Sequence, residues 1–159
     1  MSRAIKPPAP ILLSDTEIAV FLAGSIMQGA APQWQNDVEH RILAATENVV
    51  VLNPRREKWD PSWPQDPNFI PFAKQVEWEL EGLETAHVIA MYFAPETKAP
   101  VTMLELGLWA ESKKLIVCCP PGYERHGNVW MTCERYGTTM VKTMEEMLSL
   151  VLDNIRRLS

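Results

Sequence analysis

The stretch "HVIAMYFAPETKAPVTMLELGLWAESKKLIVCC", residues 87–119, decides the fold of this chain. It opens on a continuous apolar run, crosses a proline-containing loop, takes on helical spacing and ends in a second apolar run at residues 115–119. Strands that are apolar along their whole length are typical of parallel sheets covered on both faces. The stretch therefore predicts two parallel strands joined by a helix.

The same alternation runs through the rest of the chain. Two more apolar runs, residues 17–24 and 49–54, predict strands separated by a helix. Further elements are predicted as helices at 72–86, 128–136 and 143–158 and a weak fifth strand at 138–141. Right-handed crossovers then give a flavodoxin-like or Rossmann-like α/β fold. We expect a doubly wound five-stranded parallel sheet of strand order 2-1-3-4-5 with helices on both faces.

Composition limits the domain organisation and the partners. The chain has 159 residues, of which 47% are hydrophobic, which suits one domain of ordinary size. We expect a mobile N-terminal arm at residues 1–16, where prolines cluster, and a single domain at residues 17–159. A net charge of −5 argues against nucleic acid or an anionic membrane as the main partner, because both bind basic surfaces. No apolar run is long enough to span a membrane.

Cysteine and histidine usage indicates the compartment and the cofactors. The chain has three cysteines, two of them adjacent in a predicted strand, which fits reduced thiols in a cytoplasmic protein. It has no CxxC or HExxH spacing and only three scattered histidines. We therefore expect neither a metal nor another cofactor.

One carboxylate stands out, because Glu105 lies in an otherwise apolar run. In strand order 2-1-3-4-5 the winding reverses between strands one and three, and ligands bind beyond the carboxyl ends there. A helix starting near Thr102 would put Glu105 in its first turn, where the helix dipole would keep the carboxylate ionised. Such a group suits a nucleophile in glycosyl chemistry. Thr102-x-x-Glu105 is also a capping box, which the spacing alone favours.

Other segments approach the same crevice. Gly24 and Ser25 would hold a phosphate or sugar oxygens, or form an ordinary turn. At least one of Arg55 and Arg56 would reach the rim, and Trp59 or Trp63 would stack on a planar base. Alternatively the loop would be a solvated surface whose aromatic side chains cover the sheet edge. Glu79, beside the buried face of its helix, would serve as a general acid or belong to a solvated face.

The last candidate follows the fourth strand. Asn128 would donate a hydrogen bond to a sugar hydroxyl or cap the helix that is predicted to start there. Its own segment favours the cap.

Together these motifs resemble the nucleoside 2-deoxyribosyltransferase superfamily, and most of all its nucleoside 2-deoxyribosyltransferase-like branch. The resemblance covers residues 17–142 and rests on a strand ending in "GSI" and on "NPRR" (53–56), "QVEWE" (75–79), "WELEGLETAHVI" (78–89), "MLELGLWAESKKLIV" (103–117) and "GYERHGN" (122–128). It implies that Glu105 is the nucleophile and that Glu79 is the acid. It also implies that Asn128 is given to a neighbouring subunit's sugar site.

The resemblance further implies a set of substrate-binding residues. Gly24, Ser25 and Ile26 match a loop that binds the sugar-phosphate in the related 2′-deoxynucleoside 5′-phosphate N-hydrolases. The "NPRR..W" motif adds Asn53, Arg55 and Trp59. Ala99 stands where the transferases have a base-binding acid, six residues before the nucleophile, so transfer and hydrolysis both stay open.

The expected function is cleavage or exchange of the N-glycosidic bond of a (deoxy)nucleoside or nucleotide through a covalent glycosyl-Glu105 intermediate. The expected protein is a homo-oligomer whose partner is a small-molecule nucleoside or nucleotide. The alternative is a non-catalytic nucleotide-binding or sensing module that uses the same crevice.

Overall fold

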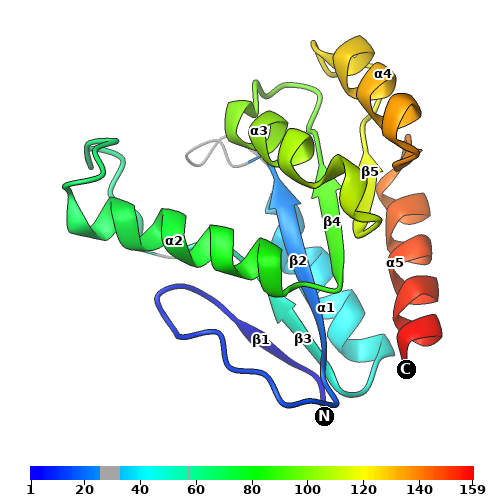
Figure 1. The fold of residues 1–159 in the computed structure, drawn as a ribbon, viewed down its shortest axis with the longest axis horizontal. Helices are drawn as coiled ribbons and strands as arrows, with labels where there is room; N and C mark the ends of the chain where they lie inside the picture. Colours follow the sequence, from blue (N-terminus) through cyan, green and yellow to red (C-terminus); the bar gives the residue numbers. More distant parts are fainter. Residues whose placement is uncertain (26–32, 57) are drawn as a thin grey trace.

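A six-stranded parallel sheet forms the centre of the molecule, as the computed structural model of residues 1–25, 33–56 and 58–159 shows (Figure 1). Its spatial order is β1-β3-β2-β4-β5-β6. The strands are β1 Arg3–Ile5, β2 Ile18–Gly24, β3 Val49–Leu52, β4 Val88–Tyr92, β5 Leu115–Cys118 and β6 Thr139–Val141. The five predicted strands are present in the predicted order, so the doubly wound α/β fold is confirmed.

The sixth strand is the correction to this prediction. Residues 3–5 fall in the segment expected to be a mobile arm, yet they form β1 and pair in parallel with β3, Arg3 opposite Val50 and Ile5 opposite Leu52. All four residues of β3 are buried, so its outer edge would otherwise leave backbone N–H and C=O groups unpaired. The chain beyond β1 is also held, because the Trp78 indole N–H donates to the carbonyl of Ala9 at 2.8 Å.

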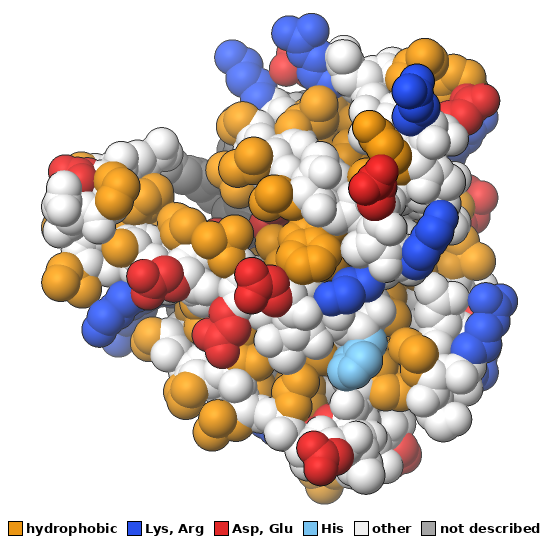
Figure 2. Space-filling model, viewed as in Figure 1, with side chains coloured by type: hydrophobic (Ala, Val, Ile, Leu, Met, Phe, Trp, Pro, Cys, Tyr) orange, Lys and Arg blue, Asp and Glu red, His pale blue; other side chains and the backbone are white. Residues whose placement is uncertain are grey.

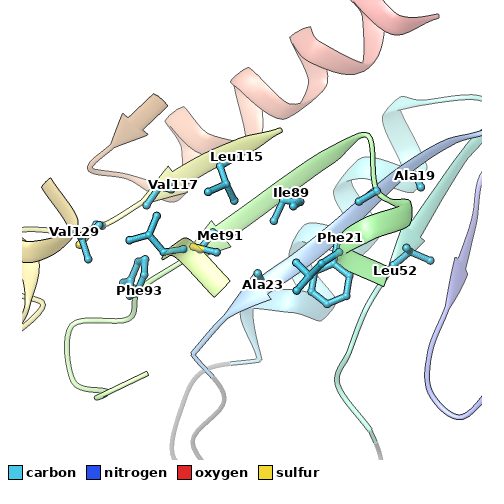
Figure 3. Close-up of a cluster of buried hydrophobic side chains, with 14 of the residues drawn as sticks. Ala19, Phe21, Ala23, Leu52, Ile89, Met91, Phe93, Leu115, Val117 and Val129 are labelled. Atoms are coloured by element: carbon cyan, nitrogen blue, oxygen red, sulfur yellow. The ribbon is translucent and has the colours of Figure 1, made fainter. Parts of the chain in front are cut away.

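Five α-helices cover the two faces of the sheet in the described ranges. Helices α1 (Trp34–Ala45) and α5 (Met144–Leu158) pack on one face. Helices α2 (Ile70–Thr85), α3 (Pro100–Trp109) and α4 (His126–Tyr136) pack on the other, and a short 3₁₀ turn follows α3. Figure 3 shows the apolar core between the sheet and helices α2, α3 and α4. In it Phe21 and Met91 point from neighbouring strands to the same side of the sheet. None of the helices in these ranges has the length and apolar character that crossing a membrane requires.

Helix α2 lies unusually close to β2. A Cβ added to Gly82 would come within 2.7 Å of the Phe21 ring, so only glycine allows this approach. The contact fixes α2 against the sheet, and Glu79 lies three residues earlier on the same helix.

Candidate active site

The winding reverses between β2 and β4, as expected, and the end of β2 lies tightly against β4 there. Gly24 ends β2 with φ +151°, and a Cβ there would lie 2.4 Å from the Tyr92 carbonyl oxygen. Next to it Ser25 is fully buried, and its hydroxyl accepts hydrogen bonds from the Ala94 amide (3.0 Å) and the Thr97 hydroxyl (2.6 Å). The predicted turn thus fastens the end of β2 to the loop after β4. Ile26 lies outside the described residues.

Helix α3 begins two residues earlier than the sequence suggests. Ala99 adopts a left-handed conformation (φ 49°) and Pro100 occupies the first helical turn, where a missing N–H costs no hydrogen bond. Thr102 is therefore the third residue of the helix and not its N-cap, and its side chain is buried. The predicted capping box is wrong. Glu105 stands in the second turn instead of the first.

Two carboxyl groups, Glu79 on α2 and Glu105 on α3, lie near enough for the charge of Glu79 to act on Glu105. Glu105 is 8% exposed, and burial, with the nearby charge of Glu79 as a second cause, raises its pKa to about 8. Burial likewise raises the pKa of Glu79 to about 7. Burial therefore opposes the expected ionisation of Glu105 at neutral pH in the unliganded protein. The dipole of α3 acts mainly on its first turn, and removal from water outweighs it at Glu105.

Gln75 ties Glu79 to the loop after β3. Its side-chain amide donates to Glu79 Oε1 at 3.2 Å and to the carbonyl oxygen of Pro54 at 3.0 Å. The bond to Glu79 lowers that carboxyl's pKa and opposes the effect of burial. Gln75 is not among the residues predicted from the sequence, although a position four residues before Glu79 on one helix puts both side chains on the same face.

Asn53 holds the end of β3 against α1. It is fully buried, and its amide donates to Glu39 Oε2 at 2.7 Å and to Asn36 Oδ1 at 3.2 Å. Its own oxygen accepts the Arg55 backbone N–H at 3.0 Å. Lys6 approaches the same Glu39 oxygen at 3.7 Å. These contacts of Asn53 are all internal, and they shape the loop that carries Arg55.

Arg55 is a half-buried cation with a neutral partner. Its guanidinium donates to Gln35 Oε1 at 3.0 Å, and burial lowers its pKa. The Gln35 amide nitrogen is fully buried and has no partner in the part of the chain that the structure describes. Because Arg55 forms no ion pair among those residues, it keeps N–H groups for an anion or a carbonyl oxygen.

Trp59 belongs to a small aromatic cluster in the loop before α2. Its ring lies edge-on to Trp63 at 4.8 Å between centroids, and Trp63 contacts Phe69 at 5.9 Å. The Arg56 guanidinium lies 5.2 Å from the centre of the Trp63 ring. The predicted long loop is therefore built around its own aromatic contacts.

Asn128 lies elsewhere. Helix α4 begins at His126, so the interpretation of Asn128 as its cap is wrong, and the side chain is exposed. It lines a hollow of about 400 Å³ with Lys98, Pro100, Met103, Glu124 and Arg125. Neither Glu79 nor Glu105 lines that hollow, so Asn128 is not placed beside the carboxyl pair of its own chain.

Comparison with known proteins identifies the family. Residues 17–123 match the family described as nucleoside 2-deoxyribosyltransferase like. The chain belongs to that family. Nucleoside 2-deoxyribosyltransferase-like proteins are generally enzymes, which agrees with a pair of carboxyl groups whose pKa values are raised by removal from water.

A solved structure supports the fold. The crystal structure of a conserved protein from Enterococcus faecalis V583 superposes with a TM-score of 0.60 at 11% identity, covering 89% of this chain and 98% of the other. At that identity the likeness concerns the fold alone. No curated protein matches the sequence.

Within this nucleoside 2-deoxyribosyltransferase-like chain, the structure brings together part of the predicted site. It places Glu79 beside Glu105 and puts Gly24 and Ser25 at the neighbouring strand ends. Asn53 and Arg55 lie in the loop after β3. Gln75 connects that loop to Glu79, because its amide donates to both Pro54 and Glu79.

Proposed function

We propose that this protein breaks the N-glycosidic bond of a deoxynucleoside or deoxynucleotide and passes the sugar to water or to a second base. The observation that carries the proposal is the coupled pair of carboxyl groups formed by the partly buried Glu79 of α2 and the buried Glu105 of α3. Family membership supports the same class of substrate. No step of this chemistry needs a metal or an organic cofactor.

In the first half of the reaction, a Glu105 carboxylate oxygen attacks the anomeric carbon. The bond from that carbon to the base breaks, its electron pair stays on the base nitrogen, and the Glu79 carboxylic acid donates a proton to the base. A glycosyl ester on Glu105 results. In the second half, Glu79, now ionised, takes a proton from water or from an incoming base, which attacks the same carbon and expels Glu105.

The reaction needs its proton on Glu79 and an ionised Glu105, whereas burial in the unliganded protein raises the pKa of both carboxyl groups. A bound base would favour the required arrangement. A base nitrogen that faces Glu79 accepts a hydrogen bond only from the protonated acid, and positive charge developing on the sugar stabilises ionised Glu105. The pair therefore becomes competent when substrate is bound.

The surrounding residues have different proposed roles. We assign direct substrate contact to Arg55, whose guanidinium bonds only Gln35 within the described ranges, and to Trp59 at the rim of the loop. Gly24, Ser25 and Asn53 would support the site by shaping its loops, since their polar contacts are internal. A 5′-phosphate or a base carbonyl would satisfy Arg55.

Base release from a panel of deoxynucleosides and their 5′-monophosphates tests the proposal. Glu105→Gln should abolish release and Glu79→Gln should lower it strongly, whereas Glu77→Gln on the exposed side of α2 serves as the matched control. Comparing nucleosides with monophosphates separates the two substrate classes, and adding a second base separates exchange from hydrolysis. Full activity of Glu105→Gln would refute the assignment.

A second candidate is a nucleotide-binding module without turnover. The observation that favours it is the pKa of Glu105, since a carboxyl group that stays protonated at neutral pH is a hydrogen-bonding group and a poor nucleophile. Tight binding of a nucleotide with no base released over hours would support this alternative.

We also propose that the protein is a homo-oligomer. Helix α3 exposes Val101 (57%), Leu104 (64%) and Leu108 (57%), and Figure 2 shows apolar side chains gathered over it. A Cβ at Gly107 would meet nothing within 4 Å, so packing within the chain does not require that glycine. A second copy lying on α3 would cover these side chains and could bring its exposed Asn128 to the site.

Light scattering after size exclusion tests the oligomeric state. Leu104→Glu with Leu108→Glu should shift the protein toward the monomer, whereas Leu158→Glu, an exposed leucine at the end of α5, should not. A monomeric wild-type protein at concentrations of about 0.1 mM would contradict the proposal.

A further inference from the structure

The buried amide of Gln75 is the one polar side chain that joins the proposed acid to another segment of the chain in the described ranges. Gln75 is 6% exposed. Its nitrogen donates both to Pro54 and to Glu79, while its oxygen is buried and has no partner among the described residues. Both contacts fall on the N–H₂ end of the side chain.

The orientation of this amide is fixed by its partners. Turning it by 180° would bring its oxygen against the Pro54 carbonyl and against a Glu79 carboxyl oxygen, which are both acceptors. The nitrogen therefore faces them, even though the oxygen is then unpaired. Because Pro54 lies two residues beyond the end of β3, the amide is anchored close to the sheet through a backbone group.

The contact also distinguishes the two oxygens of Glu79. Oε1 accepts the Gln75 N–H at 3.2 Å, so the proton of the neutral acid is better placed on Oε2. A carboxyl group that turned freely about its last torsion would present either oxygen to the substrate. Fixing one of them sets the direction of proton transfer.

We propose that Gln75 is a positioning residue for Glu79, holding Oε1 through its anchored amide so that Oε2 carries the proton delivered to the departing base. This inference rests on the proposed function, in which Glu79 is the acid. Gln75 itself touches neither the substrate nor the reacting atoms. It acts on the orientation and the proton affinity of Glu79.

The charged groups around Glu79 come from neighbouring elements. Glu105 of α3 is the acidic group that interacts with Glu79. The first cation of the loop after β3, Arg55, is bonded to Gln35 and forms no ion pair with Glu79 among the described residues. Burial raises the pKa of Glu79, and the Gln75 N–H is the group that lowers it. Removing that N–H therefore raises the pKa of Glu79 further and makes it a weaker acid for the base.

The experiment compares Gln75→Met, Gln75→Glu and, as a control, Lys74→Met on the exposed side of α2. Methionine fills the same space without the N–H; it removes the unpaired oxygen but leaves the Pro54 carbonyl without its donor, so thermal unfolding of the variant is measured first to establish that it folds. Gln75→Glu keeps the shape but replaces the donor by an acid. The readouts are the pKa of Glu79 by carbon NMR in the unliganded protein, and kcat and KM for base release across pH.

For Gln75→Met we expect the pKa of Glu79 to rise by about one unit and kcat to fall about tenfold, with KM changed less than about twofold. Gln75→Glu should raise the pKa more, because it adds a like charge. Lys74→Met should match wild type in every measurement. A folded Gln75→Met variant with wild-type kcat and an unchanged Glu79 pKa would overturn the inference.

The two proposals fail in different ways. If Glu79→Gln is inactive and Gln75→Met is fully active, the proposed function survives and the positioning role is wrong. If Glu79→Gln and Glu105→Gln both release base at the wild-type rate, the proposed function fails. The NMR titration of Glu79 then still reports whether Gln75 controls its proton affinity.

Discussion

Helices α3 and α5 cover the same sheet and differ in capping, in burial and in the placement of their polar groups. Helix α5 is capped by Thr143, whose hydroxyl accepts the Glu146 N–H at 3.1 Å, and it buries an apolar stripe that includes Val151. Helix α3 starts after a left-handed Ala99 without a side-chain cap and buries Glu105. One helix places its polar groups outside, and the other places a carboxyl group inside and leucines outside.

The difference separates an element that stabilises the fold from one that we assign to chemistry. In α5 the local preferences, the capping and the burial all agree, which is what specifies a stable structure. In α3 they conflict. Burying a carboxyl group costs solvation free energy, and the exposed leucines contribute no hydrophobic stabilisation to a single protomer. Conflicts of this kind are expected at functional sites. Substitutions in α3 and in α5 should therefore have different effects on activity and stability.

The largest effect is expected from replacing the buried acid of α3. Glu105→Gln removes the proposed nucleophile, so base release should fall by at least about 10³-fold. Glu146→Gln on α5 is the matched control and should keep wild-type activity, measured by the same base-release assay. Equal base release by the Glu105→Gln and Glu146→Gln variants would contradict the assignment of α3 to the chemistry.

The next effect concerns the apolar stripe of α5. Val151→Ala leaves a cavity at a fully buried position, and we expect the free energy of unfolding to fall by about 2–3 kcal/mol. Leu104→Ala on α3 removes a side chain that is 64% exposed, and it should change stability by less than about 0.5 kcal/mol in the dissociated protomer. Chemical denaturation at low protein concentration measures both. Similar losses would show that α3 is covered even in the protomer.

The pH dependence of stability follows from the raised pKa values of the carboxyl pair. In the folded protein Glu105 has a pKa of about 8 and Glu79 of about 7, against 4.5 for an exposed glutamate. Between about pH 4.5 and pH 8 the folded state therefore holds more protons than the unfolded state, and stability falls as pH rises through that window.

Glu105→Gln should flatten this dependence and raise the free energy of unfolding at pH 8 by about 1–3 kcal/mol. Denaturant titrations at pH 5 and pH 8 give the measurement. The same substitution would thus remove activity and add stability. A wild-type protein whose stability rises from pH 5 to pH 8 would contradict burial as the dominant influence on the pair.

The smallest effects concern the helix starts. Thr143→Ala should cost about 1 kcal/mol, because the first turn of α5 loses its cap. Ala99→Gly should stabilise α3 by about 0.5–1 kcal/mol, since glycine adopts the left-handed conformation without strain. Thermal unfolding of both variants gives the measurement, and an Ala99→Gly variant that is less stable than wild type would show that the alanine methyl group packs usefully.

The same two helices show what the sequence could predict. The α5 boundary at Thr143 and the five-strand order follow from capping, periodicity and continuous apolar runs, which are local signals. The early start of α3 depends on the backbone at Ala99, and the protonation of Glu105 depends on a neighbouring helix. The residues next to Glu105 in the sequence therefore predict neither the first residue of α3 nor the protonation of Glu105.

The site follows the same division. Glu79 and Glu105 could be predicted from their motifs, and the i, i+4 spacing of Gln75 to Glu79 was a usable signal. The bond between Arg55 and Gln35 joins residues 20 positions apart, and its geometry depends on how α1 meets the loop after β3. Contacts between distant segments of this kind are fixed by packing, which local periodicity does not encode.

Strand β1 has a practical consequence for handling the protein. Residues 1–16 resemble a dispensable leader in composition, and a truncation that starts the chain at residue 17 would be a natural choice for expression. That cut would strip the outer edge of β3 and leave four valine and leucine residues, Val49–Leu52, as an unprotected border. Open borders of this kind template aggregation with other chains. Affinity tags and fusions should therefore be attached after α5, whose last residue, Leu158, is exposed.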